Sequence, residues 1–354
     1  MPRHRPREKH ALLARLRCTI FGVAAGVALS AGLSAPARAQ LMQLHAAGPV
    51  EGLAVTSEAL VWKFHGCNPD FPSDRSFVRS LPAIPARGLL GALPPNTLYS
   101  GRTCNLEDIV ASRNVVVNRT HAFWVTGDGS LVRMPLNRSR TAPEVLIRRA
   151  SSAPSLTVLA LSGTWIAWTD GAGVYRAPID WFRPARPIAT VMNPGSVGPL
   201  EDLVPMGDGY VLRGRNRIWR LVPFGAGFWP IELRNSSRTT AFAVANDRIF
   251  LALALTGGWE IGWILPDFSY VDLFRGTGTT SRVDQMAAVP GGSLFFHLSG
   301  PDGAGPLMRW WAGAERRPIT PDIRMLGDSR LAIGPYFVFW ASNEGLMRVP
   351  VARP

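Results

Sequence analysis

Residues 123–135 read FWVTGDGSLVRMP, and the same pattern returns in AWTDGAGVYRAP (167–178) and FWASNEGLMRVP (339–350). Each stretch has an apolar residue followed by Trp, then a turn, a basic residue and, two positions later, Pro. The first two Trp residues are 44 positions apart, and the third follows the second after 172 positions, which is four steps of 43. A repeat of about 40–45 residues is typical of the blades of a β-propeller.

Weaker copies of the pattern stand where this period predicts them. Steps of 43 from the second Trp lead to YVL (210–212), IFLA (249–252) and LFFH (294–297). A further copy, LVWK (60–63), lies upstream of the first clear one. These copies predict seven blades, with a six-bladed ring as the alternative.

Each copy has room for four short strands. In residues 155–192, apolar and β-branched runs are separated by Gly, Asp and Pro signals, as one blade requires. The 35 Gly and 30 Pro of the chain break any sustained helical period, so we expect an all-β fold. The recurring Trp is expected to pack between blades, and the alternative is a row of aromatic rings that stack on a ligand.

The two ends of the chain predict how the ring closes. The last copy ends at Val351 after only three strands, whereas residues 41–47 precede the first strand of the first copy. An N-terminal strand that completes the last blade would leave no exposed strand edge there. We therefore expect residues 41–47 to form its outer strand.

Residues 1–39 have the pattern of a cleaved signal peptide. A basic segment precedes the apolar run 18–33, and Ala37-Arg38-Ala39 supplies an A-x-A cleavage pattern before Gln40. The run is too short for a comfortable transmembrane anchor. The predicted organisation is a signal peptide at 1–39 and one propeller domain at 40–354, in a periplasmic or secreted protein.

The charge of +13 overstates how basic the exported domain is. The first 39 residues contain seven Lys or Arg and one Glu, so +6 leaves with them and about +7 remains. Export argues against nucleic acid as the partner. The oligomeric state cannot be derived from these features.

Two cysteines, Cys67 and Cys104, remain after cleavage. In an exported chain such a pair predicts a disulfide, here one that would enclose a Pro-rich insertion at 67–104. The chain-entropy model gives a bond across this loop a contribution of about 4 kcal/mol. Two free buried thiols are the alternative.

The clearest charged motif is RGRNR (213–217), which places Arg213, Arg215 and Arg217 on one side of a predicted hairpin. Three guanidinium groups at this spacing repel one another unless carboxylates or a bound anion offset them. They are candidate ligands for a phosphate, an acidic glycan or an acidic protein. The alternative is a solvated hairpin tip.

Metal chemistry has weaker support. His65, His121 and His297 fall on or beside the second strands of different copies. Structural histidines held by hydrogen bonds are a simpler interpretation of this placement than a metal site with three histidine ligands. The adjacent carboxylate pairs are Glu107-Asp108 and Glu201-Asp202. Each precedes a predicted inner strand, so the alternatives are turn carboxylates in water or a carboxylate-lined channel mouth that binds a divalent cation.

WTD (168–170) followed by VYR (174–176) resembles the YWTD repeats of low-density-lipoprotein-receptor-type propellers. FWVT (123–126) and FWAS (339–342) are similar in degenerate form. That family has six blades, whereas seven copies are present here. The resemblance implies a propeller that binds partners without catalysis, and it carries no site residue over to this chain.

The predicted function is therefore that of an exported binding or scaffolding module for a protein or an anionic ligand. No nucleophile elbow, phosphate-binding loop or dinucleotide fingerprint stands in a suitable context, and no cofactor is expected. The alternative is a metal-dependent hydrolase or lactonase with its site at the channel mouth.

Overall fold

The computed structural model describes eighteen stretches of the chain, and every structural statement below concerns them. They are residues 42–46, 50–67, 75–83, 95–102, 105–170, 173–180, 188–190, 200–214, 217–224, 227–235, 238–245, 248–265, 267–278, 280–290, 292–311, 316–325, 330–342 and 345–351.

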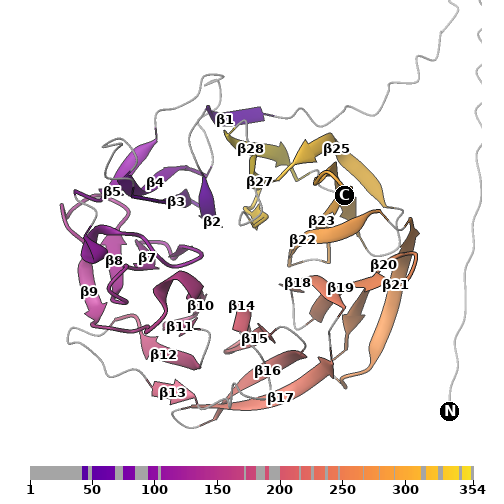
Figure 1. Cartoon of the computed structure of the whole chain (residues 1–354), viewed down its shortest axis with the longest axis horizontal. Coiled ribbons are helices and arrows are strands. Elements are labelled where there is room, and N and C mark those ends of the chain that lie inside the picture. Colours follow the sequence, from indigo (N-terminus) through magenta and orange to yellow (C-terminus); the bar gives the residue numbers. More distant parts are fainter. Residues whose placement is uncertain are drawn as a thin grey trace, which may run out of the picture. The chain divides into compact units, whose positions relative to one another are not determined.

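Seven four-stranded antiparallel sheets are arranged in a ring (Figure 1), which confirms the predicted seven-bladed β-propeller. Blade 1 contains, from the inner strand outward, β2 (Glu51–Val55), β3 (Ala59–Cys67), β4 (Arg75–Pro82) and β5 (Asn96–Ser100). Blade 2 contains β6 (Val116–Val117), β7 (His121–Val125), β8 (Leu131–Pro135) and β9 (Glu144–Ile147). Blade 3 contains β10 (Val158–Ser162), β11 (Trp165–Thr169), β12 (Val174–Pro178) and β13 (Ile188–Thr190).

The remaining blades have the same order. Blade 4 contains β14 (Leu200–Met206), β15 (Gly209–Gly214), β16 (Arg217–Phe224) and β17 (Gly227–Asn235). Blade 5 contains β18 (Thr239–Ala245), β19 (Arg248–Leu255), β20 (Gly258–Ile264) and β21 (Tyr270–Thr277). Blade 6 contains β22 (Arg282–Ala288), β23 (Leu294–Ser299), β24 (Ala304–Trp310) and β25 (Arg317–Arg324). Blade 7 contains β26 (Ala332–Ile333), β27 (Phe337–Ser342), β28 (Gly345–Pro350) and β1 (Met42–Ala46).

The ring closes through its N-terminal strand, as the incomplete last repeat predicts. β1 pairs antiparallel with β28, with Met42 opposite Arg348 and Ala46 opposite Gly345. The outer edge of β28, which would otherwise be exposed, is thereby covered. Blade 7 thus combines strands from both ends of the described chain.

The repeated Trp packs between blades, which confirms that interpretation over the ligand-stacking alternative. Trp62, Trp124, Trp168 and Trp340 are each at most 1% exposed. Trp124 of blade 2, for example, shares a core cluster with Val61 and Val78 of blade 1. Burial of such large apolar surfaces between neighbouring sheets supplies the main stabilisation of the ring.

The basic residue of the motif lies on the third strand. Arg176 and Arg348 stack on aromatic rings, whereas Nε of Arg133 lies 3.0 Å from Oε2 of Glu144. Arg79, on the third strand of blade 1, also stacks on a ring. The guanidinium carbon of Arg79 lies 4.0 Å from the ring centre of Phe77, and that of Arg348 lies 4.2 Å from Phe337. Burial lowers the pKa of Arg79 and of Arg348. Cation–π packing therefore accounts for the Arg of the third strand in blades 1, 3 and 7, and an ion pair holds it in blade 2.

The segment 67–104, predicted as an insertion, contains β4 and β5 and so supplies the outer half of blade 1. Cys104 lies outside the described residues, as does the side chain of Cys67 at the end of β3. The predicted signal peptide, 1–39, also lies outside them. In the described ranges no helix is long and apolar enough to cross a membrane. The helices found there are the short 3₁₀ turns η1 (Leu106–Asp108) and η2 (Pro154–Leu156).

Candidate functional site

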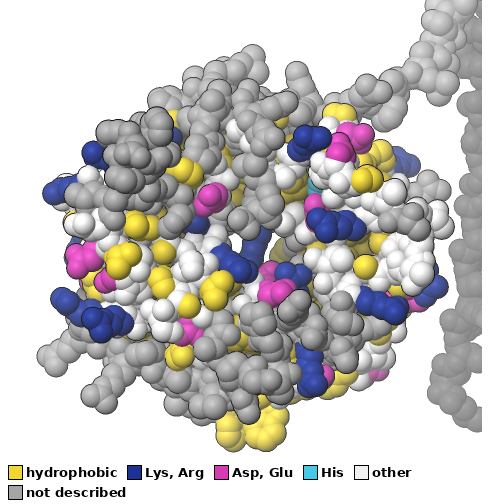
Figure 2. All heavy atoms as spheres, in the orientation of Figure 1, with side chains coloured by type: hydrophobic (Ala, Val, Ile, Leu, Met, Phe, Trp, Pro, Cys, Tyr) yellow, Lys and Arg dark blue, Asp and Glu magenta, His cyan; other side chains and the backbone are white. Residues whose placement is uncertain are grey.

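A cavity of about 500 Å³ follows the axis of the ring. Its wall includes residues from or beside all seven inner strands, β2, β6, β10, β14, β18, β22 and β26. Most of the residues in its wall are apolar by type, but charged side chains gather in one part of it. Figure 2 shows Lys or Arg and Asp or Glu side chains around the central opening of the ring.

These charged side chains belong to residues at or just before the starts of inner strands. Arg113 precedes β6, Glu201 and Asp202 begin β14, and Arg330 precedes β26. They contact one another across the channel, which places the starts of these strands at the same end of the ring. We call this group, together with Arg213, Thr240 and Asp284, the channel mouth.

Glu201 and Asp202 both line the channel although neighbouring strand residues normally point to opposite faces. The pairing of β14 with β15 shifts register between Leu200 and Asp202, which leaves Glu201 as the extra residue of a β-bulge. The pairing of β22 with β23 shifts in the same way at Asp284. Such bulges re-aim side chains, and here they turn carboxylates into the channel.

Each carboxylate of the mouth faces a cation. Asp202 forms an ion pair with Arg330, and Glu201 lies 3.5 Å from Nη2 of Arg213. Arg213 also donates from Nη1 to the backbone oxygen of Thr240 at 3.1 Å. The third carboxylate, Asp284, contacts the ring of a buried histidine.

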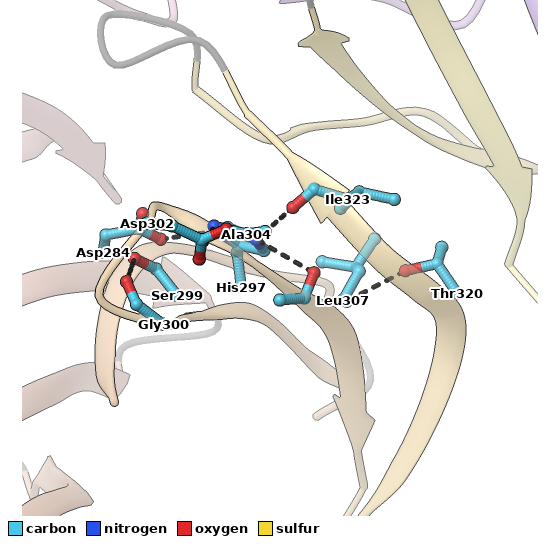
Figure 3. A network of polar contacts seen from close by, with 10 residues as sticks. Asp284, His297, Ser299, Gly300, Asp302, Ala304, Leu307, Thr320 and Ile323 are labelled. Atoms are coloured by element: carbon cyan, nitrogen blue, oxygen red, sulfur yellow. Dashed lines mark hydrogen bonds and ion pairs between the residues drawn. The ribbon is translucent and has the colours of Figure 1, made fainter. Parts of the chain in front are cut away.

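That histidine, His297 of β23, is completely buried. Figure 3 shows its polar contacts. Its Nδ1 lies 2.8 Å from Oδ1 of Asp284, and its Nε2 lies 3.1 Å from the oxygen of Gly305 and 3.2 Å from that of Ile323. A carboxylate and two carbonyls are acceptors, so the doubly protonated imidazolium is the form of the ring that satisfies every contact. Burial lowers the pKa of His297, but the hydrogen bond and charge of Asp284 and the two carbonyls outweigh it and raise the pKa.

Arg113 differs from the other two arginines of the mouth. It is exposed, and its Nη1 donates to the backbone oxygen of Glu201 at 3.5 Å. Among the residues that the structure describes, no carboxylate lies within ion-pair distance of it. The mouth therefore has one guanidinium that is open to an external anion.

The arginines of the predicted hairpin do not all face the same site. Arg213 lines the channel, whereas Arg217 of β16 lies 2.8 Å from Oε2 of Glu232 on the outer strand β17. Arg215 lies outside the described residues. Carboxylates of the chain itself thus offset two of the three charges.

The remaining candidates lie away from the mouth. Asp108 accepts a hydrogen bond from the hydroxyl of Tyr99 at 3.2 Å, and Glu107 is exposed, so this carboxylate pair is not part of the cavity wall. Nδ1 of His121 lies 2.8 Å from Oγ1 of Thr120. The side chain of His65 lies outside the described residues.

Metal-ligand geometry is not found in the described part of the chain, because no three His, Cys, Asp or Glu side chains converge there. Glu201 and Asp202 do line the mouth, as one of the sequence alternatives required. Their partners are arginines rather than further acidic ligands. This arrangement fits recognition of charged groups better than it fits a cation site.

Comparison with known proteins supports the fold. No protein-family model and no curated protein matches the chain. Among solved structures, YCF48 bound to the D1 peptide has a TM-score of 0.58 and 15% identity over 91% of this chain and 100% of that chain. A chain of the Mitotic Checkpoint Complex has a TM-score of 0.59 and 11% identity over 96% of this chain and 100% of that one.

Two further structures extend this result. Human WBSCR16 has a TM-score of 0.54 and 10% identity over 87% of each chain. The extracellular domain of BT4673 from B. thetaiotaomicron has a TM-score of 0.50 and 10% identity, with 88% of this chain and 39% of that chain covered. The present chain thus spans well under half of that structure. At such identities the likeness establishes a β-propeller and leaves the YWTD type of repeat as a prediction.

Proposed function

We propose that this protein is an exported binding module whose channel mouth binds an anionic group, a carboxylate in particular, of a partner protein or ligand. The observation that carries the proposal is Arg113, an exposed guanidinium with no carboxylate partner among the described residues, at the rim of a 500 Å³ cavity. Two further guanidiniums, of Arg213 and Arg330, line the same cavity.

The chemistry of the mouth suits such a ligand. Guanidinium groups present several N–H donors in one plane and bind carboxylates or phosphates in bidentate fashion. Arg213 and Arg330 are already held in place by Glu201 and Asp202, so little side-chain entropy is lost when a ligand joins them.

The arginine hairpin belongs to the same proposal. We propose that Arg213, Arg215 and Arg217 also contact the anionic partner, in competition with Glu201 at Arg213 and with Glu232 at Arg217. Replacement of all three by Gln is expected to weaken binding of an acidic partner and to leave the fold intact. Binding by the triple variant that is as tight as wild type would remove the hairpin from the site.

Export supports the choice of partner. We propose that residues 1–39 are removed, that the domain 40–354 acts in the periplasm or outside the cell, and that Cys67 and Cys104 form a disulfide. Propellers of the YWTD type bind partners without catalysis, and the similar structures include one bound to a peptide and one within an assembly. A peptide complex and a protein assembly are both contexts in which a propeller acts as a binding surface without catalysis.

The test uses fluorescein-labelled hexaglutamate as the anionic probe and fluorescence anisotropy as the readout. Arg113→Gln is expected to weaken binding about tenfold, because charge-assisted hydrogen bonds contribute about 1.5–3 kcal/mol. Arg119→Gln is the matched control, since Arg119 is an exposed arginine of the same blade that does not line the cavity. Equal affinities of the two variants, or equal binding of labelled hexalysine, would contradict the proposal.

A further inference from the structure

His297 and Asp284 connect the buried interior of blade 6 to the channel mouth. Asp284 lies in the bulge of the inner strand β22 and lines the cavity. His297 lies on the second strand β23 and has no exposed surface. The 2.8 Å contact between Nδ1 and Oδ1 is the link between them (Figure 3).

The hydrogen-bond geometry favours the positively charged form of the ring. Nδ1 donates to a carboxylate, and Nε2 faces the backbone oxygens of Gly305 and Ile323. A neutral imidazole has only one N–H, so it would leave either Asp284 or both carbonyls without a donor. Loss of the proton therefore breaks one side of this network, in an interior where an unpaired polar group is costly.

We propose that His297 is a positioning residue for the channel mouth: its doubly protonated ring holds the Asp284 carboxylate against the wall and balances its charge, so that anion binding weakens when His297 loses its proton. This inference rests on the proposed function and specifies its regulation. With His297 protonated, the channel mouth and the buried ring behind Asp284 together contain four cations, Arg113, Arg213, Arg330 and His297, against the three carboxylates of Glu201, Asp202 and Asp284. Without that proton, anion and cation charges are equal and Asp284 has lost its cationic partner.

The other charged groups on the elements packed around β22 and β23 do not replace it in this role. They are Arg282 on β22, Asp302 in the turn after β23, Arg309 on β24, Asp322 and Arg324 on β25, and Arg248 and Glu260 on strands β19 and β20 of blade 5. Arg309 stacks on Phe295 and Trp311. Asp302 pairs with Arg324 at 3.0 Å, and Glu260 pairs with Arg275 at 2.7 Å. Arg282 and Asp322 are exposed to solvent.

The first measurement follows His297 itself. In full-length exported protein labelled with ¹³C at histidine Cε1, NMR titration is expected to give His297 a midpoint above the usual value of about 6.5. Asp284→Asn keeps the shape of the carboxylate but removes its charge, so the midpoint is expected to move down. A ring that is neutral at pH 6, or a midpoint that Asp284→Asn does not change, would overturn the inference.

The second measurement follows hexaglutamate binding by anisotropy from pH 6 to pH 9, a range in which glutamate side chains remain ionised. As pH rises, the affinity of the wild type for hexaglutamate is expected to fall about three- to fivefold, because one nearby positive charge is lost. The midpoint of this fall should equal the midpoint of the His297 titration. His297→Gln is expected to bind weakly and without this pH dependence. His121→Gln is the matched control, because His121 lies on a second strand away from the mouth, and it should retain the wild-type profile.

The outcomes separate the two proposals. Binding that depends on Arg113 but does not change through the His297 midpoint overturns the role of His297 and leaves the proposed function standing. Absence of hexaglutamate binding at every pH overturns both. If His297→Gln does not fold, the wild-type midpoints and the Asp284→Asn shift decide the question without it.

Discussion

Asn114 illustrates how a single side chain joins two blades. Its Nδ2 donates to the backbone oxygen of Leu159 at 2.8 Å, and its Oδ1 accepts from the Leu159 N–H at 2.8 Å. Leu159 belongs to the inner strand β10, whose inner edge has no strand partner. The side-chain amide of Asn114 thus pairs with the buried N–H and C=O groups of Leu159, which no neighbouring strand pairs with.

We predict that Asn114→Ala lowers the free energy of unfolding by about 2–3 kcal/mol, because it leaves a buried donor and a buried acceptor unpaired. Equilibrium urea denaturation measures the change. Asn118→Ala is the control, since Asn118 accepts hydrogen bonds only from residues of its own exposed turn. Equal costs for the two substitutions would show that the Asn114 bridge is unimportant.

The buried imidazolium makes stability depend on pH. The pKa of His297 is raised in the folded protein, so its contribution is complete below the unfolded value of about 6.5 and is lost as pH rises through the folded value. The urea concentration at the unfolding midpoint of the wild type is expected to fall as pH rises from about 6.5 through the folded pKa of His297. The midpoint of His297→Gln is not expected to fall over the same range. The same pH slope in both proteins would contradict this assignment.

The residues of the site were only partly predictable. Glu201 and Asp202 stood out because they are adjacent and precede a predicted inner strand. Arg113 and Arg330 have no such local pattern, since each precedes its strand in an ordinary loop sequence. They come together with Asp202 and Glu201 only because ring closure brings the starts of distant strands to one mouth.

Secondary structure was predicted well where packing repeats. The Trp of the second strand recurs in blades 1, 2, 3 and 7 because it fills the space between neighbouring blades, and the Arg of the third strand stacks on aromatic rings in blades 1, 3 and 7. The β-bulges at Glu201 and Asp284 were not predictable, because a bulge depends on the register between two strands. Likewise the sequence did not predict strands β4 and β5, because the prolines in and around this segment argue against regular strands.

Strand β1 is the element whose removal tests the closure of the ring. The free energy of unfolding of a chain of residues 47–354 is expected to be about 2–5 kcal/mol lower than that of a chain of residues 40–354, because the hydrogen bonds between β1 and β28 are lost. The shortened chain also exposes the edge of β28 and should self-associate. Urea denaturation and light scattering measure both effects, and identical behaviour of the two chains would refute the closure.

The predicted Cys67–Cys104 bond would connect the end of β3 to the segment after β5 and so enclose the outer half of blade 1. Thiol labelling of exported, denatured and unreduced protein is expected to find no free thiol after cleavage of residues 1–39. Reduction should cost about 4 kcal/mol on the chain-entropy model. Two labelled thiols per molecule would exclude the bond.

At the scale of the whole molecule, the channel mouth and three exposed aromatic side chains lie at opposite faces of the ring. The inner strands begin at the charged mouth, so the turns after the first and third strands lie at the opposite face. Exposed aromatic side chains occur in such turns, namely Phe224, Phe268 and Tyr336. A ligand that is recognised by charge is therefore expected to bind at the mouth.

Hydrogen-exchange mass spectrometry with hexaglutamate tests this central claim most directly, because it locates binding without a substitution. Protection is expected at the starts of the inner strands, in residues 113–117, 200–203, 239–242 and 330–333, and not in the aromatic turns of the opposite face. Protection confined to those turns or to the outer strands, with no change at the inner-strand starts, would contradict a binding site at the channel mouth.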